Sequence, residues 1–251
     1  MVLLAAPLAG EAQQAGKMYR VGLLEVVPAA SNATNLAAFR QGLKELGYSI
    51  GQNVVMEYRS ADGRPERFPG LAEELVRLKV DVIVTRGTPA AIAAKQATGT
   101  IPIVMASSGD PLSTGLVASL AHPGGNVTGL SALATDIEGK QLELIKEIVP
   151  RITRIGFLFN MSNPVRRAEW KEAETLAHSA GVQPKLIDVR KADDIDAALD
   201  AATRERLGAL AVGIDPVTQA NREQIAQALI TRHLPSMSRE REFVDAGGLM
   251  S

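Results

Sequence analysis

Short apolar runs alternate with longer amphipathic segments along most of the chain. In the first half, four runs predict β-strands: YRVGLLE, NVVMEYR, VDVIVT and IPIVMA. Segments with apolar residues at helical spacing follow the first three runs and predict helices near residues 35–46, near residues 68–78 and from Pro89 onward. The first of these helices ends at Gly47, because glycine is typical of the position after a helix C-terminus.

The second half of the chain repeats this order. TRIGFLFN begins at Thr153, which lies 134 residues after Tyr19, where YRVGLLEV begins. A helix expected at residues 165–179 ends at Gly181, which lies 134 residues after Gly47. The runs KLIDVR, ALAVGIDP and LPSMS then match the second, third and fourth strands of the first half. Four strand–helix units therefore recur in two copies of about 110 residues each.

Alternating strands and helices predict α/β architecture with mostly parallel sheets and helices on both faces. Two copies predict two lobes, here called lobe one (residues 18–130) and lobe two (residues 131–245). Residues 246–251 would begin a crossing back to lobe one. The alternative is one doubly wound sheet with coincidental spacing, but the matched glycines and strand–loop–helix junctions favour two lobes.

Ligands of open parallel sheets bind beyond the carboxyl ends of the strands. The loops expected there span residues 27–35, 86–89 and 107–111 in lobe one, and 160–164 and 215–218 in lobe two. These loops carry small polar residues, which suit binding better than catalysis. The candidate ligand-binding residues are Ser31, Gly87, Thr88, Ser107, Ser108, Asp110, Asn160, Ser162 and Asp215.

The chemistry of these residues suggests an amino acid as the ligand. Thr88 and Ser108 can donate hydroxyl groups to an anion, and helices expected to start at Pro89 and Pro111 add free N–H groups and a positive dipole end. Asp215, at the matching junction of lobe two, can accept an ammonium group. Each hydroxyl could instead be an ordinary helix cap, and for Asp110 capping is the favoured interpretation.

Composition and motifs narrow the functional classes. The net charge of −1 argues against nucleic acid, which requires a basic face. Because the chain contains no cysteine, it cannot form disulfides or use thiolate nucleophiles or cysteine-ligated metals. The phosphate-binding loop, the dinucleotide-binding glycine pattern, the nucleophile elbow and the zinc-protease motif are all absent. No cofactor, metal or catalytic residue is therefore expected.

The N-terminus resembles part of a secretory signal. An apolar run at residues 2–9 precedes Gly10-Glu11-Ala12, which has the small-x-small form of a cleavage site. No lysine or arginine precedes the run, so residues 1–17 predict either a signal remnant or a disordered tail. The signal interpretation is favoured and predicts a periplasmic location without a lipid anchor, since no cysteine follows the run.

Several segments resemble one known family. The segments YRVGLLE…AFRQGLKELGY, RFPGLAEELVRLKVDVIVTRGTPAA, IPIVMASSGDPLSTGLVASLAHPGGNVTGLS and EFVDAGGLMS are similar to the substrate-binding proteins of ABC transporters. The branch in question includes tryptophan- and tyrosine-binding members. The resemblance runs from Met18 to Ser251, and the segment that begins at Asp110 is its most specific part.

The resemblance implies a two-lobed periplasmic-binding-protein fold of type I with three crossings between the lobes. It implies capture of an amino-acid-like or aromatic molecule by hinge closure and delivery to an inner-membrane ABC permease. Related amino-acid-binding proteins hold the ligand carboxylate at positions that match Thr88, Ser107 and Ser108. Family members usually continue well past GGLMS, so the last part of lobe one is expected to be missing from this chain.

Two other functions share the predicted architecture. The ligand domain of a transcription regulator would need an N-terminal helix-turn-helix, and residues 1–17 are too few to form one. A two-lobed enzyme such as a racemase would need a pair of cysteines or other acid and base groups across the cleft. Aromatic residues are scarce, and Phe159 is the one expected to lie where it could stack on an aromatic ligand.

Overall fold

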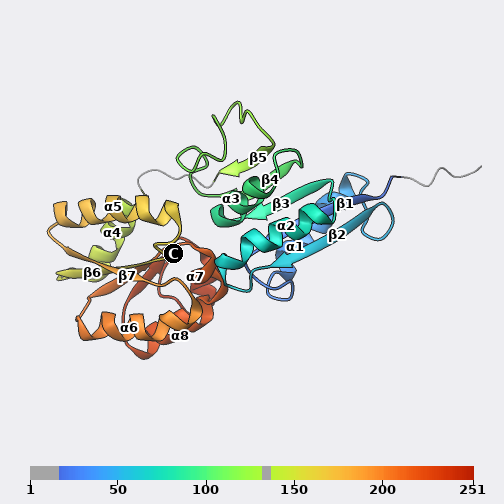
Figure 1. The fold of residues 1–251 in the computed structure, drawn as a ribbon. Coiled ribbons are helices and arrows are strands. Elements are labelled where there is room, and N and C mark those ends of the chain that lie inside the picture. The colour runs from blue at the N-terminus through green and yellow to red at the C-terminus, as the bar shows by residue number, and fades with distance from the viewer. Residues whose placement is uncertain (1–16, 132–136) are drawn as a thin grey trace, which may run out of the picture.

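The computed structural model describes residues 17–131 and 137–251, so the predicted signal at residues 1–17 lies almost wholly outside the described part. The chain forms two parallel sheets flanked by helices (Figure 1), as predicted. Lobe one contains β1 (Tyr19–Glu25), α1 (Ala33–Glu45), β2 (Val54–Ser60), the short 3₁₀ helix η1 (Pro65–Arg67), α2 (Phe68–Arg77), β3 (Val82–Arg86), α3 (Thr88–Ala97), β4 (Ile103–Ser108) and β5 (Val127–Ser131).

Lobe two repeats this alternation with one additional helix before its first strand, two helices instead of one after its third strand, and a further helix after its fourth strand. Its elements are α4 (Ile137–Ile148), β6 (Arg154–Phe159), α5 (Pro164–Ser179), β7 (Gln183–Asp188), η2 (Ala192–Asp194), α6 (Ile195–Arg204), β8 (Ala209–Val212), α7 (Pro216–Ala220), α8 (Arg222–Thr231), β9 (Ser236–Ser238) and α9 (Arg241–Asp245). Met250 forms a further parallel bridge with Met237 of β9.

The two sheets share one strand order. Lobe one is ordered β2-β1-β3-β4-β5 and lobe two is ordered β7-β6-β8-β9, with parallel pairing between all neighbours. In both lobes the first strand of the copy therefore lies inside the sheet and the second lies at its edge. This common order supports the internal repeat seen in the sequence and sends the carboxyl ends of the strands in each lobe to one edge.

Helices cover both faces of the lobe-two sheet, whereas the lobe-one sheet has one fully buried face and one face that α1 covers in part. In lobe one, α2 and α3 cover one face around Ile83 and Ile103, while Leu36 of α1 packs on the other. In lobe two, α6 and α8 cover one face, and α4 and α5 cover the face that carries Phe157. Burial on both faces explains why the inner strands β6 and β8 are almost continuously apolar, whereas β3 alternates between buried and half-buried positions.

One detail differs from the sequence-based expectations. No helix begins at Pro111: the segment after it forms turns in which the N–H groups of Leu112 and Ser113 donate to Asp110 Oδ1. The expected helix fails because the turn closes at Gly115, whose N–H bonds to Leu112 O. Within the described ranges, no helix has the length and apolar composition needed to span a membrane.

Gly129 on β5 fixes the pairing of the strand that leaves lobe one. It lies opposite Met105 of β4 and has a φ of +136°. A Cβ at this position would lie 2.2 Å from Met105 O and 2.6 Å from Met105 N. Only glycine therefore allows the two backbones to pair here, close to Ser107 and Ser108 on the same strand β4.

We expect Gly129→Ala to destabilise lobe one by at least about 2 kcal/mol, because it combines backbone strain with a clash against a neighbouring strand. The corresponding fall in melting temperature is at least about 4 °C by thermal unfolding. Gly125→Ala is the matched control, since its Cβ meets nothing within 4 Å. Equal melting temperatures for the two variants would contradict this explanation.

Candidate functional site

A cavity of about 500 Å³ lies between the lobes at the carboxyl ends of their strands. This is where open parallel sheets bind ligands. We call it the interlobe cavity, and its wall includes Arg86, Gly87, Thr88, Ser107 and Asp110 from lobe one and Val165, Arg166, Glu169, Asp215, Arg239 and Glu240 from lobe two.

The lobe-one wall presents hydrogen-bonding groups suited to an anion. Thr88 Oγ1 lies 3.2 Å from Ser108 Oγ and accepts a bond of 2.9 Å from Gly109 N, and both hydroxyl side chains are buried. Thr88 is the first residue of α3, and no side chain caps this helix. The N–H groups of its first turn therefore have no partner within the helix, and the positive end of its dipole faces the cavity wall.

The lobes meet at small residues: Ala220 of lobe two packs against the lobe-one core, and Gly87 and Gly109 of lobe one leave little room for a side chain. A Cβ at Gly87 would lie 3.6 Å from Pro216 Cγ, and one at Gly109 would lie 3.0 Å from Val165 Cγ1. None of the hydrogen bonds and ion pairs between residues of the described ranges 17–131 and 137–251 joins one lobe to the other. Hydrogen bonds that join the two walls of the cavity are therefore left for a bound ligand to form.

Asp215 is held by three hydrogen bonds within lobe two. Its Oδ1 accepts from Asn160 Nδ2 and from Val217 N at 2.9 Å each, and its Oδ2 accepts from Asn163 Nδ2 at 2.8 Å. The side chain caps α7 together with Thr218. Asp215 is 1% exposed, and its hydrogen bonds join the β6–α5 loop to the β8–α7 loop. Most of its hydrogen-bonding capacity is therefore already used.

Four charged side chains form a connected network in the lobe-two wall. Arg239 Nη1 donates to Glu138 Oε1 at 3.4 Å, and Arg239 Nη2 donates to Glu169 Oε1 at 3.2 Å. Arg166 Nη1 forms an ion pair with Glu169 Oε2. The network ties the start of α4 and the first turns of α5 to the segment after β9, and all four residues line the cavity.

One more pair of opposite charges lies on the two sides of the cavity. Arg86, at the end of β3, forms an ion pair with the buried Glu25 at 3.4 Å. Glu240, from lobe two, accepts a hydrogen bond from Gln219 Nε2. Burial raises the pKa of Glu240, and the positive charge of Arg86 opposes this rise. The two side chains therefore interact electrostatically across the lobes.

The structure brings most of the predicted residues together. Gly87, Thr88, Ser107, Asp110 and Asp215 line the interlobe cavity. Directly behind this wall, Ser108 bonds to Thr88 and Asn160 bonds to Asp215.

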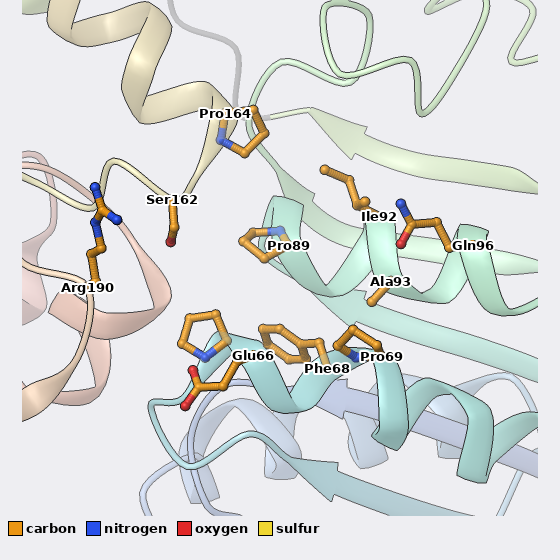
Figure 2. A pocket seen from close by; sticks show the side chains of 11 residues that line it. Glu66, Phe68, Pro69, Pro89, Ile92, Ala93, Gln96, Ser162, Pro164 and Arg190 are labelled. Carbon is orange, nitrogen blue, oxygen red and sulfur yellow. The ribbon is translucent and has the colours of Figure 1, made fainter.

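Two predicted residues lie outside the interlobe cavity. Ser31 is an exposed turn residue and does not belong to its wall. Ser162 lines a different pocket, of about 540 Å³, which also lies between the lobes (Figure 2). There, Phe68, Pro89 and Ile92 of lobe one face Ser162 and Arg190 of lobe two. This second pocket is largely apolar and lacks the hydroxyl pair and the charged network.

The charged part of the site was not predicted from the sequence. Three of its residues lie at or just beyond the carboxyl ends of strands: Arg86, Arg239 and Glu240. Position beyond a strand end, which identified Thr88, could also have identified these three. Arg166 and Glu169 lie in the first turns of α5 and gave no comparable signal. The expectation for Phe159 is wrong: its ring packs in the lobe-two core against Phe157 instead of facing the cavity.

Burial raises the pKa of four carboxyl groups in or beside the interlobe cavity: Glu25, Glu169, Asp215 and Glu240. Such groups contribute most stability below their unfolded-state pKa and lose that contribution as pH rises through the folded-state pKa. On the surface, hydrogen bonds lower the pKa of Asp62 and Asp81. These two groups weaken the fold only at lower pH, near and below their ordinary pKa of about 4.

We therefore expect the melting temperature of the ligand-free protein to rise as pH is lowered from about 7.5 toward about 5, because acids with raised pKa values take up protons in the native state before they do so in the unfolded chain, where the ordinary pKa is about 4. Differential scanning fluorimetry across this range measures the change. Glu240→Gln should reduce the pH dependence, because it removes one of the buried titrating groups. A melting temperature that falls steadily over the same range would contradict the prediction.

Comparison with known proteins gives relatives with the same architecture. The chain is 27% identical to the tyrosine-binding protein of Clostridioides difficile over 93% of its own length and 67% of that protein. A crystal structure of a conserved domain protein from Vibrio cholerae is 29% identical, with a TM-score of 0.83, and the match covers 93% of this chain and 78% of that one. An ABC domain from Streptococcus pneumoniae in complex with L-Trp is 27% identical, with a TM-score of 0.81 and the same coverage.

These matches confirm the fold and the family suggested by the sequence. Two parallel sheets flanked by helices, with a cavity between them at the strand ends, form the type I periplasmic-binding-protein architecture. The model of the ABC transporter substrate-binding protein family matches residues 20–251, and the chain belongs to this family.

Proposed function

We propose that the chain captures an amino acid in the interlobe cavity, without turnover, and delivers it to an ABC permease. The observation that carries this proposal is the uncapped N-terminus of α3 beside the buried hydroxyl pair of Thr88 and Ser108. Backbone N–H groups and hydroxyls at a helix N-terminus suit a carboxylate. The opposing wall is rich in carboxyl groups, which suits an ammonium group.

The mode of contact between the lobes supports capture by closure. Small apolar contacts bring Gly87 close to Pro216 and Gly109 close to Val165. Because these contacts carry no polar bond between described residues, they favour the closed arrangement only weakly. A ligand bonded to both walls binds the closed state better than the open state and shifts the balance toward closure.

The relatives favour an aromatic amino acid. One is named a tyrosine-binding protein and another was solved in complex with L-Trp. Glu240 and Asp215 are the acids that we propose for the ammonium side of the cavity. Of these, Glu240 accepts a single described hydrogen bond, from Gln219, whereas Asp215 accepts three. An aromatic acid without an amine would leave this side of the cavity unmatched.

Binding explains the cavity better than catalysis does. Its described wall contains no cysteine or histidine, and its carboxyl groups are engaged in hydrogen bonds or ion pairs instead of forming a free acid–base pair. A permease partner and a periplasmic location complete the proposal. Both follow from membership of the family and from the predicted signal segment.

The proposal is tested by measuring ligand binding directly. Calorimetry and thermal shift should be run with a panel of L-amino acids, with their α-carboxamides and with the matching acids that lack the amine. A ligand at about 100 times its Kd adds about 2.7 kcal/mol of stability, or roughly 5–10 °C. Amidation of the carboxyl and removal of the amine should each abolish this shift. If no amino acid shifts the melting temperature of the folded protein, the proposal fails.

We expect Thr88→Val to weaken amino-acid binding by roughly tenfold to a hundredfold, because a hydrogen bond to a charged group contributes about 1.5–3 kcal/mol. Thr88→Ser keeps the hydroxyl and should retain affinity within about threefold. Thr34→Val, at an exposed position of α1, is the isosteric control. Unchanged affinity in folded Thr88→Val would exclude Thr88 as a carboxylate ligand.

A further inference from the structure

Arg86 differs from the other two arginines of the interlobe cavity in how its guanidinium group is engaged. The terminal nitrogens of Arg166 and Arg239 pair with acidic side chains of α4 and α5. Arg86 makes one ion pair, from its inner nitrogen Nε to Glu25. Within residues 17–131 and 137–251, its terminal nitrogens Nη1 and Nη2 have neither a hydrogen-bond partner nor an ion-pair partner.

These terminal nitrogens are accessible. Nε is buried against the Glu25 carboxylate, 3.4 Å away, and the side chain of Arg86 is 26% exposed, compared with 9% for Glu25. Nη1 and Nη2 are not buried, and Arg86 lines the interlobe cavity. The guanidinium group also interacts electrostatically with Glu240 on the opposite wall. Glu25 therefore holds the inner end of the guanidinium group, and the outer end is available to a ligand.

A β-bulge places Arg86 beside Ser107. Thr85 of β3 pairs with Met105 of β4, but the next residue, Arg86, pairs with Ser107, so Ala106 has no partner in β3. Bulges of this kind change the direction of side chains beside binding sites. Arg86 and Ser107 both line the cavity, and the Ser107 hydroxyl also has no hydrogen-bond partner among the described residues. Unengaged donors thus lie next to each other where β3 and β4 end.

A carboxylate is the group that these donors suit best. A planar guanidinium group can donate two parallel hydrogen bonds to the two oxygens of a carboxylate. A carboxamide offers one acceptor oxygen, and its NH₂ group would face other donors. Six acidic side chains and three arginines line the cavity, so a carboxylate needs a nearby cation to offset the repulsion. Arg86 is the one cation that the described lobe-one wall supplies.

We infer that Arg86 determines specificity by pairing its two terminal nitrogens with the ligand carboxylate, beside Thr88 and Ser107. The inference rests on the proposed function and deepens it, because lobe one then recognises the negative charge of the carboxylate as well as its hydrogen-bonding oxygens. No ion pair between described residues joins Arg86 to Glu240 across the cavity. An amino acid with its carboxylate toward Arg86 and its ammonium group toward Glu240 supplies a partner to each.

The preference for a carboxylate over a carboxamide tests the inference. Competition calorimetry should compare L-tyrosine and L-tryptophan with their α-carboxamides, or the tightest-binding L-amino acid of the panel with its own carboxamide. In Arg86→Gln, this preference should fall by about tenfold to a hundredfold, because a hydrogen bond to a charged group is lost for the acid alone. Since the readout is a ratio of two affinities in one variant, a loss of stability alone does not change it.

Arg190→Gln is the matched control. Arg190 also lies just beyond a strand end and pairs through Nε with an acid, Asp188, but it lines the second pocket instead of the interlobe cavity. Its removal should change the preference by less than about threefold. An unchanged preference in Arg86→Gln overturns the inference, and so does an equal fall in Arg190→Gln, which would indicate a general effect of charge.

The two proposals fail in distinguishable ways. If no amino acid binds to the folded protein, the proposed function fails. If amino acids bind and Arg86→Gln weakens the acid and the carboxamide by the same factor, the proposed function stands and the assignment of Arg86 fails.

Discussion

Parallel strand pairing is the constraint from which the site follows. When all strands of a sheet run in one direction, their carboxyl ends gather at one edge, and each chain segment must turn there into a helix. The turns place helix N-termini and short polar side chains at that edge. In this protein the edge of lobe one presents Thr88 and the edge of lobe two presents Asp215 and Arg239, so one topological rule supplies both walls of the cavity.

The two walls differ in what they require. The lobe-one wall carries Arg86 and Asp110 together with a hydroxyl pair that is bonded internally, because Thr88 Oγ1 already accepts from Gly109 N and lies beside Ser108 Oγ. The lobe-two wall has more charged residues, and ion pairs join Arg166 to Glu169 and Arg239 to both Glu138 and Glu169. The proposed binding of a carboxylate by lobe one and of an ammonium group by lobe two agrees with this difference.

The sequence predicted the fold more completely than the site. Strands and helices were predictable because apolar runs and helical spacing are local signals, and Thr88 was predictable because it follows a strand directly. The turn at Asp110 was mistaken for a helix start because Asp110 Oδ1 accepts from the N–H groups of Leu112 and Ser113. An aspartate that caps a helix accepts from the same positions.

The charged network could not be predicted from the sequence, for a different reason. Its bonds join residues 70 and 101 positions apart, and no local pattern records which acid meets which base. Phe159 was misplaced because strand burial on both faces directs its ring inward, which a position near a loop does not reveal.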